Sequence, residues 1–238
     1  MMALPVQKTP IYTIDIPSTK QKFKFRPFLV KEEKALMLAQ QSDDVTTMTD
    51  TLKAVIKSCA LSKVDVDELA TFDLEYIFCQ IRGKSVGEII DLLFFCDVCD
   101  DEKAGVKLSF DVTKLKVLFE PDHDKKIPLF DDVGIVMKYP NITVLNQLIE
   151  LDANDGDAVI DAITNCIDYI YTNEEMFYAK EQTKEELVEF INNMTTEQFA
   201  KVQKFFDTMP KFQEPVKYTC PVCAREHNKM LTGISNFF

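Results

Sequence analysis

The chain has 238 residues, of which 46% are hydrophobic, enough to bury a sizeable core. Its formal net charge of −12 argues against nucleic acid as the main partner, because binding to a phosphate backbone relies on clustered Lys and Arg. Since the sequence shows neither a signal peptide nor a long apolar run, we expect a soluble, intracellular protein that binds no membrane.

The first part of the chain is predicted to contain a hairpin followed by helices. Apolar residues alternate in YTIDI and in KFKF, on either side of a polar turn at residues 17–20. The pattern then becomes helical in KEEKALMLAQQ, TLKAVIKSCAL and FDLEYIFCQI, the last of which Gly83 is expected to end. Residues 1–30 are therefore predicted to be strand-rich and residues 31–85 helical.

The remaining elements continue this alternation of strand-rich and helical regions. VGEIIDLLFFC is predicted to be a buried strand, and VKLSFDV, KLKVLF, IPLF and GIVMKY alternate as strands do, so residues 86–139 are predicted to be strand-rich. Residues 141–209 are predicted to be helical, including the whole of DAVIDAITNCIDYIY, with capping boxes at Thr183 and Thr195. Residues 211–238 are predicted to form a C-terminal hairpin.

These elements define the expected fold class, which is α+β. We predict a single α+β body over residues 1–238, with an antiparallel strand-rich middle and a C-terminal hairpin flanked by helices. Neither an internal repeat nor a low-complexity linker suggests a further division.

Two Cys-x-x-Cys pairs form the most specific motif of the sequence. Cys96 and Cys99 stand in FFCDVCDDE, and Cys220 and Cys223 stand in YTCPVCARE. Four thiolates in two such turns match the ligands of a closed, structural zinc site. The long separation between the pairs weakens the motif, because compact zinc ribbons usually have loops of roughly 15–20 residues. We predict zinc as the cofactor, and unmetallated thiols remain the alternative.

Other interpretations of the polar residues and cysteines have less support. His227 could replace one sulfur, although a solvated histidine is the simpler interpretation. A redox function is disfavoured, because strands are predicted to follow both pairs where a thioredoxin-like site needs a helix. RGKS at residues 82–85 fails the phosphate-loop pattern, because Phe78 stands where glycine is required. Cys59, Cys79 and Cys166 lie in apolar contexts and are expected to be buried, inert thiols.

Three segments, by their sequences and their order along the chain, suggest a family. KFKFRPFLVKEEKALMLA, FDLEYIFCQIRGKSVGEII and VGIVMKYP resemble the baseplate hub and hub-assembly proteins of contractile-tailed bacteriophages of the T-even type. The resemblance covers residues 23–140 and extends more loosely into the helical region beyond. It implies a non-enzymatic protein that binds other baseplate hub proteins in the host cytoplasm and is either an assembly factor or a hub subunit that stays in the virion. It implies no catalytic residues.

A protein of this kind needs binding surfaces, and two helices are candidates. One is the charged helix around Lys31 and Lys34, whose simpler interpretation is a solvated face. The other carries Phe199, Phe205 and Phe206, whose simpler interpretation is a stripe facing the core. No nucleic acid, membrane or small-molecule substrate is expected. The alternative function is a metal-dependent or redox enzyme that uses the cysteine pairs.

Overall fold

The computed structural model describes residues 8–42, 44–99, 102–150 and 156–233. Contacts divide the chain into two compact units. Unit 1 comprises the described residues up to Leu118 and from Lys211 onward, and unit 2 is Phe119–Pro210. The sequence predicts one body instead. Local periodicity identifies elements but not their contacts, so it gives no sign that the middle of the chain is an insertion.

Unit 1 combines helices with three small antiparallel sheets. Its helical elements are α1 (Val30–Gln40), α2 (Val45–Cys59), α3 (Thr71–Ser85) and the short η1 (Glu102–Ala104). Its strands are β1 (Tyr12–Asp15), β2 (Lys22–Phe25), β3 (Ile89–Phe94), β4 (Val106–Asp111), β5 (Val117–Leu118), β10 (Lys211–Thr219) and β11 (Glu226–Thr232). The predicted N-terminal hairpin is confirmed, because β1 pairs with β2 from Tyr12–Phe25 to Asp15–Lys22.

The core of unit 1 comes from β2 and the inner faces of α2 and α3. Its fully buried large side chains include Phe23, Phe25, Leu52, Ile56, Leu74, Ile77, Phe78 and Ile81. Helix α3 continues through Gly83 instead of ending there. A Cβ atom on Gly83 would lie 2.7 Å from Thr113 Cγ2, so this glycine lets the helix approach the residues after β4.

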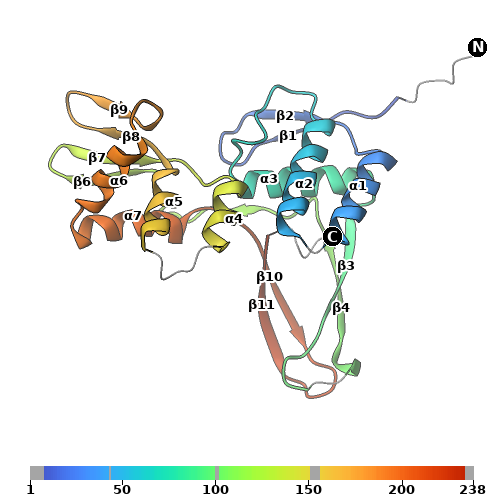
Figure 1. Cartoon of the computed structure of the whole chain (residues 1–238). Coiled ribbons are helices and arrows are strands. Elements are labelled where there is room, and N and C mark those ends of the chain that lie inside the picture. The colour runs from blue at the N-terminus through green and yellow to red at the C-terminus, as the bar shows by residue number, and fades with distance from the viewer. Residues whose placement is uncertain (1–7, 43, 100–101, 151–155, 234–238) are drawn as a thin grey trace, which may run out of the picture. The chain divides into compact units, whose positions relative to one another are not determined.

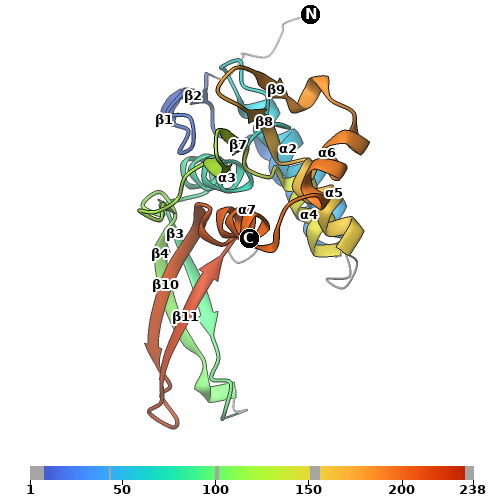
Figure 2. The ribbon, with the colours of Figure 1, turned by 90° about the vertical axis from the view of Figure 1, so that its left-hand side faces the viewer.

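Two long hairpins extend away from α1–α3 and lie side by side (Figures 1 and 2). Strand β3 pairs with β4, and β10 pairs with β11 and, at its first residues, with β5. The two hairpins belong to different sheets, and no strand pairing joins them within the described residues. Strand β3 is less buried than predicted, because Ile89 and Leu93 are exposed. We call the two hairpins together the arm.

Unit 2 is a four-stranded antiparallel sheet with helices. Its strands, in the order β6-β7-β8-β9, are β6 (Lys126–Phe130), β7 (Val133–Met137), β8 (Ile167–Tyr171) and β9 (Met176–Tyr178). Its helical elements are α4 (Ile142–Glu150), α5 (Gly156–Thr164), η2 (Ala179–Glu181), α6 (Lys184–Asn192) and α7 (Thr196–Thr208). Both predicted capping boxes are present, at Thr183 before α6 and at Thr195 before α7.

The sheet and helices of unit 2 share one hydrophobic core. Strands β6, β7 and β8 contribute Ile127, Leu129, Ile135, Met137, Ile167 and Ile170, and helices α6 and α7 contribute Leu187, Ile191, Val202 and Phe205. The prediction that residues 141–209 are helical throughout is wrong at β8 and β9. Helix α5 ends at Thr164, and the chain then enters the sheet beside β7.

Candidate metal centre

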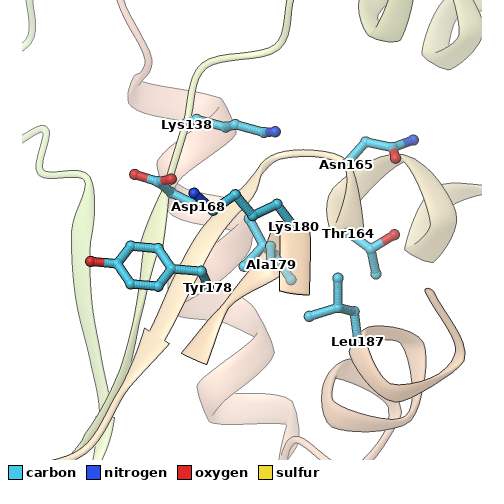
Figure 3. Close-up of a pocket in the computed structure, with 9 residues that line it drawn as sticks. Lys138, Thr164, Asn165, Asp168, Tyr178, Ala179, Lys180 and Leu187 are labelled. Carbon is cyan, nitrogen blue, oxygen red and sulfur yellow. The ribbon is translucent and has the colours of Figure 1, made fainter. Parts of the chain in front are cut away.

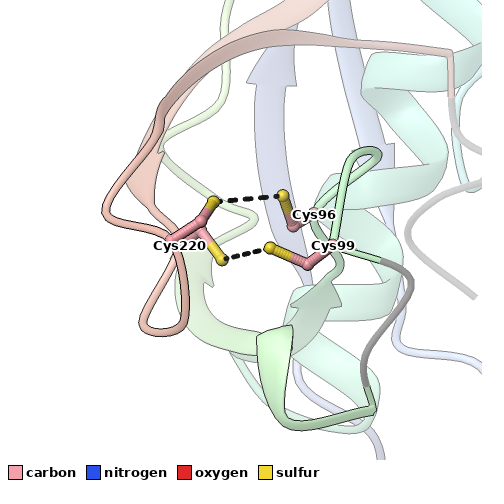
Figure 4. Close-up of side chains that lie close together, drawn as sticks. Cys96, Cys99 and Cys220 are labelled. Atoms are coloured by element: carbon pink, nitrogen blue, oxygen red, sulfur yellow. Dashed lines mark hydrogen bonds between the residues drawn. The ribbon is translucent and has the colours of Figure 1, made fainter.

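The two cysteine pairs meet at the tip of the arm (Figure 4). Cys96 and Cys99 lie in the turn after β3, and Cys220 and Cys223 lie in the turn between β10 and β11. Cys96 Sγ is 3.9 Å from Cys223 Sγ, and Cys99 Sγ is 3.7 Å from Cys220 Sγ. All four sulfur atoms lie within 4.8 Å of one another. The predicted convergence of the two distant pairs is therefore present in the fold.

The C-terminal turn is held tightly by its own backbone. The Cys220 N–H donates to the Arg225 carbonyl at 2.9 Å, and the Ala224 N–H donates to the Cys220 carbonyl at 3.0 Å. Ala224 has a φ of +57°, in the left-handed region that glycine normally occupies. This conformation reverses the chain directly after Cys223, so that both thiols of the pair face the opposite turn.

The peptide N–H groups of each turn favour the thiolate form of its first cysteine. The Val98 and Cys99 N–H groups lower the pKa of Cys96 against the effect of burial. The Cys223 N–H, aided by that of Val222, lowers the pKa of Cys220 to about 7. Hydrogen bonding to Cys223, together with burial, raises the pKa of Cys99. The thiolate is the form of cysteine that binds a metal ion.

The surroundings of the four thiols are small and partly apolar. Cys96, Cys220 and Ala104 form a buried cluster against which Cys99 packs, whereas Cys223 is exposed. Ala104 comes from η1, whose helical turn covers the site from the side of the β3–β4 hairpin. The sequence pattern gave no indication of this third contributor.

His227 lies beside the cysteines and is buried, so the expectation of a solvated histidine is wrong. Its ring stacks on Tyr218, with centroids 4.8 Å apart, and Nδ1 lies 3.5 Å from Asp97 Oδ1. Among the residues that the structure describes, its buried Nε2 has no hydrogen-bond partner. One imidazole nitrogen and one Asp97 oxygen lie within 4.8 Å of Cys96 Sγ. The structure thus adds Asp97 and His227 to the neighbourhood of the cluster.

The other three cysteines lie away from the arm tip, as predicted. Cys59, Cys79 and Cys166 are fully buried. Burial raises the pKa of Cys59 to about 11 and that of Cys166 to about 12, and it also raises the pKa of Cys79. These thiols are protonated at neutral pH and behave as small apolar side chains.

Of the two helices considered as binding surfaces, one turns its candidate residues to the core and the other exposes apolar residues. In α7, Phe205 is buried in the core of unit 2, and Phe199 and Phe206 pack against that core. This stripe is structural. Helix α1 buries Glu32, Leu36 and Ala39 on one face. The opposite face exposes Val30, Met37 and Leu38, each by more than half, which the charged pattern did not predict.

A hollow of about 380 Å³ opens on unit 2 (Figure 3). Its polar lining includes Lys138, Asn165, Asp168 and Lys180, placed around β8 and η2. Figure 3 shows Lys138 and Asn165 on separate segments of the rim.

Comparison with known proteins places the chain in a family. The model of the T4 bacteriophage base plate protein family matches residues 9–238. The chain therefore belongs to this family and is a phage baseplate component. A curated relative, the baseplate hub assembly protein gp26 of Enterobacteria phage T4, is 21% identical over 227 residues, which cover 95% of this chain and 97% of the relative. The resemblance inferred from sequence is confirmed.

Two further findings concern solved structures and membrane-spanning helices. No solved structure matches the chain. Within the described ranges, no helix has both the length and the apolar character needed to span a bilayer.

Proposed function

We propose that this protein takes part in assembling the central hub of the phage tail baseplate by binding other hub proteins. The role is non-enzymatic and is exercised in the host cytoplasm, before or while the protein enters the tail. The observation that carries the proposal is the correspondence, over nearly the whole of both chains, with a hub assembly protein. A match of that extent includes residues of both units and of the arm, which supports a proposal for the whole chain and not for one part of it.

The exposed face of α1 is the surface that we assign to partner binding. Val30, Met37 and Leu38 are separated by seven and eight positions, which places them on one side of a helix. Lys31 and Lys34 stand beside them and are exposed. Such a surface suits a partner with an apolar patch bordered by acidic groups, because apolar contact supplies affinity and peripheral charges supply orientation.

The experiment is co-expression of the chain with each tagged hub protein encoded by the same phage, followed by size-exclusion chromatography and affinity measurement. We expect a stoichiometric complex with at least one of them. Met37→Ser/Leu38→Ser should weaken that complex by about tenfold or more, which corresponds to ~1.4 kcal/mol. The matched control is Met176→Ser/Phe177→Ser, which removes two exposed apolar side chains from β9 of unit 2.

The possible results test the proposed function and the assigned binding surface separately. Failure to form a complex with any hub protein would overturn the proposed function. A complex that the α1 variant binds as tightly as the control variant would overturn only the assignment of the surface. Circular dichroism of both variants checks that each remains folded.

A further inference from the structure

We propose that Cys96, Cys99, Cys220 and Cys223 bind one zinc ion in a closed, structural site that fastens the tips of the two hairpins of the arm. The inference concerns unit 1 alone and stands independently of the proposed function. It rests on the positions of the sulfur atoms, on the form of the two turns and on the finding that no strand pairing joins the two hairpins among the residues that the structure describes.

The spacing of the sulfur atoms matches a tetrahedral site. A zinc–sulfur bond of about 2.3 Å places the sulfurs of a regular tetrahedron roughly 3.8 Å apart. The Cys96–Cys223 and Cys99–Cys220 distances of 3.9 Å and 3.7 Å lie on either side of that value. Disulfide bonds would need about 2.05 Å, so the same pairs are not arranged as cross-links between cysteines.

The two turns resemble each other in the features that a metal site requires. In each, the first cysteine accepts hydrogen bonds from the backbone N–H groups two and three residues later. Such bonds hold the sulfur in a fixed direction, as outer-shell partners of metal ligands do.

The set of ligands favours zinc and a structural role. Four soft thiolates in a tetrahedral arrangement suit zinc or iron, and a site with four protein ligands leaves no position for water or substrate. The rival set of Cys96, Asp97 and His227 is less suitable. The Asp97 side chain is 63% exposed, and His227 is packed against Tyr218. We therefore place His227 beside the ligands rather than among them.

The arm gives the site its structural purpose. Each hairpin is a separate pair of strands in this region, and an isolated hairpin is marginally stable in water. Near the tip, the Tyr218 hydroxyl donates to the Phe95 carbonyl at 2.9 Å, and the Phe94 and Tyr218 rings lie 5.4 Å apart. His227 Nδ1 of β11 also lies 3.5 Å from Asp97 Oδ1 in the turn after β3, and beyond these contacts lies the small cysteine cluster. A zinc ion there would supply four bonds across the gap.

Binding of the ion needs no oxidant or reductant. Each thiol that becomes a ligand releases its proton to solvent and donates a sulfur electron pair to Zn²⁺, while cysteines already present as thiolates bind directly. The four thiolates and the ion together carry a net charge of −2. The reaction is therefore a reversible exchange of protons for metal, and chelators reverse it.

The test is elemental analysis of the full chain purified under reducing, chelator-free conditions, together with X-ray absorption at the zinc edge. We expect one zinc per chain, surrounded by four sulfurs at about 2.3 Å. Cys220→Ser/Cys223→Ser should abolish binding, whereas Cys166→Ala, which alters a buried thiol of unit 2, should retain it. Removal of the metal from the wild-type protein should make the arm turns, but not unit 2, sensitive to limited proteolysis.

Several results would overturn the proposal. A reduced wild-type protein that neither contains zinc nor takes it up would exclude the site. Zinc retained by the Cys220/Cys223 double variant would place the ion elsewhere. Three sulfurs and one nitrogen around the ion would exclude the four-cysteine ligand set, and iron in place of zinc would refute the choice of ion. Addition of Co²⁺ to the metal-free protein keeps the test valid if a variant fails to fold, because tetrahedral thiolate coordination gives characteristic visible absorption in the wild type.

Discussion

Replacing Glu32 by glutamine tests how a buried carboxylate holds unit 1 together. Glu32 is 5% exposed, and its Oε1 lies 2.9 Å from Arg26 Nη2. Ser58 Oγ donates to the same oxygen at 2.7 Å, and the Leu29 N–H donates to Oε2 at 2.8 Å. The carboxylate thus connects the residue after β2, the start of α1 and the end of α2.

The expected loss of stability in Glu32→Gln follows from the pKa of this carboxyl group. Burial raises the pKa of Glu32, but hydrogen bonds from Arg26, Ser58 and Leu29 outweigh burial and lower it from 4.5 to about 2. A difference of this size corresponds to about 3 kcal/mol of stability. Because the folded pKa lies below the unfolded one, this stabilisation is fully present above pH 4.5 and is lost as the pH falls towards 2. We therefore expect Glu32→Gln to lower the free energy of unfolding by about 3 kcal/mol at pH 7.

The assay is urea unfolding followed by far-UV circular dichroism at pH 7 and at pH 3. The control is Glu33→Gln, which removes the same charge from an exposed neighbour and should change stability by about 0.5 kcal/mol or less. At pH 3 the difference between wild type and Glu32→Gln should shrink by about 2 kcal/mol. A difference below about 1 kcal/mol at pH 7, or one that does not depend on pH, would refute the reasoning.

Two further substitutions test backbone positions by the same measurement. Gly83→Ala should destabilise the protein by about 1–3 kcal/mol, because the new Cβ would lie 2.7 Å from Thr113 Cγ2. A Thr113→Ser background lacks that methyl group, so Gly83→Ala should be neutral or stabilising there. A loss that persists in the double variant would contradict this cause. Ala224→Gly should stabilise the arm by about 0.5–1 kcal/mol by relieving a φ of +57°, whereas Ala35→Gly in α1 should cost about 1 kcal/mol. Equal losses in both variants would show that the left-handed turn carries no strain.

Local signals in the sequence predict local structure well. Thr183 and Thr195 each accept a hydrogen bond from the N–H three residues later, as the capping-box pattern indicates, because all the groups involved lie within one helical turn. The cysteine pairs are also found together, since two Cys-x-x-Cys turns in one chain favour a common site. Whether they hold zinc stays a prediction.

Strand pairing between distant segments explains the main errors of the predictions made from sequence. Ile163, Ile167 and Ile170 have helical spacing, yet Ile167 and Ile170 belong to β8. The pairing of β7 with β8 shifts register between Val136 and Met137, so two strand residues three positions apart both face the core. A bulge of this kind imitates helical periodicity. The division into two units has no local signal either, because it depends on where β10 pairs.

The insertion of unit 2 has a consequence for the order in which the chain is made. Leu118 pairs with Lys211, so unit 1 cannot complete the β5–β10 pairing until all of unit 2 has left the ribosome. At roughly 5–20 residues per second, the stretch from residue 100 to Cys220 takes on the order of 10 s to translate. Unit 2 is continuous in sequence and has this interval in which to fold. The arm is therefore the last part of the molecule that can close, because Cys96 and Cys99 are synthesised well before Cys220 and Cys223.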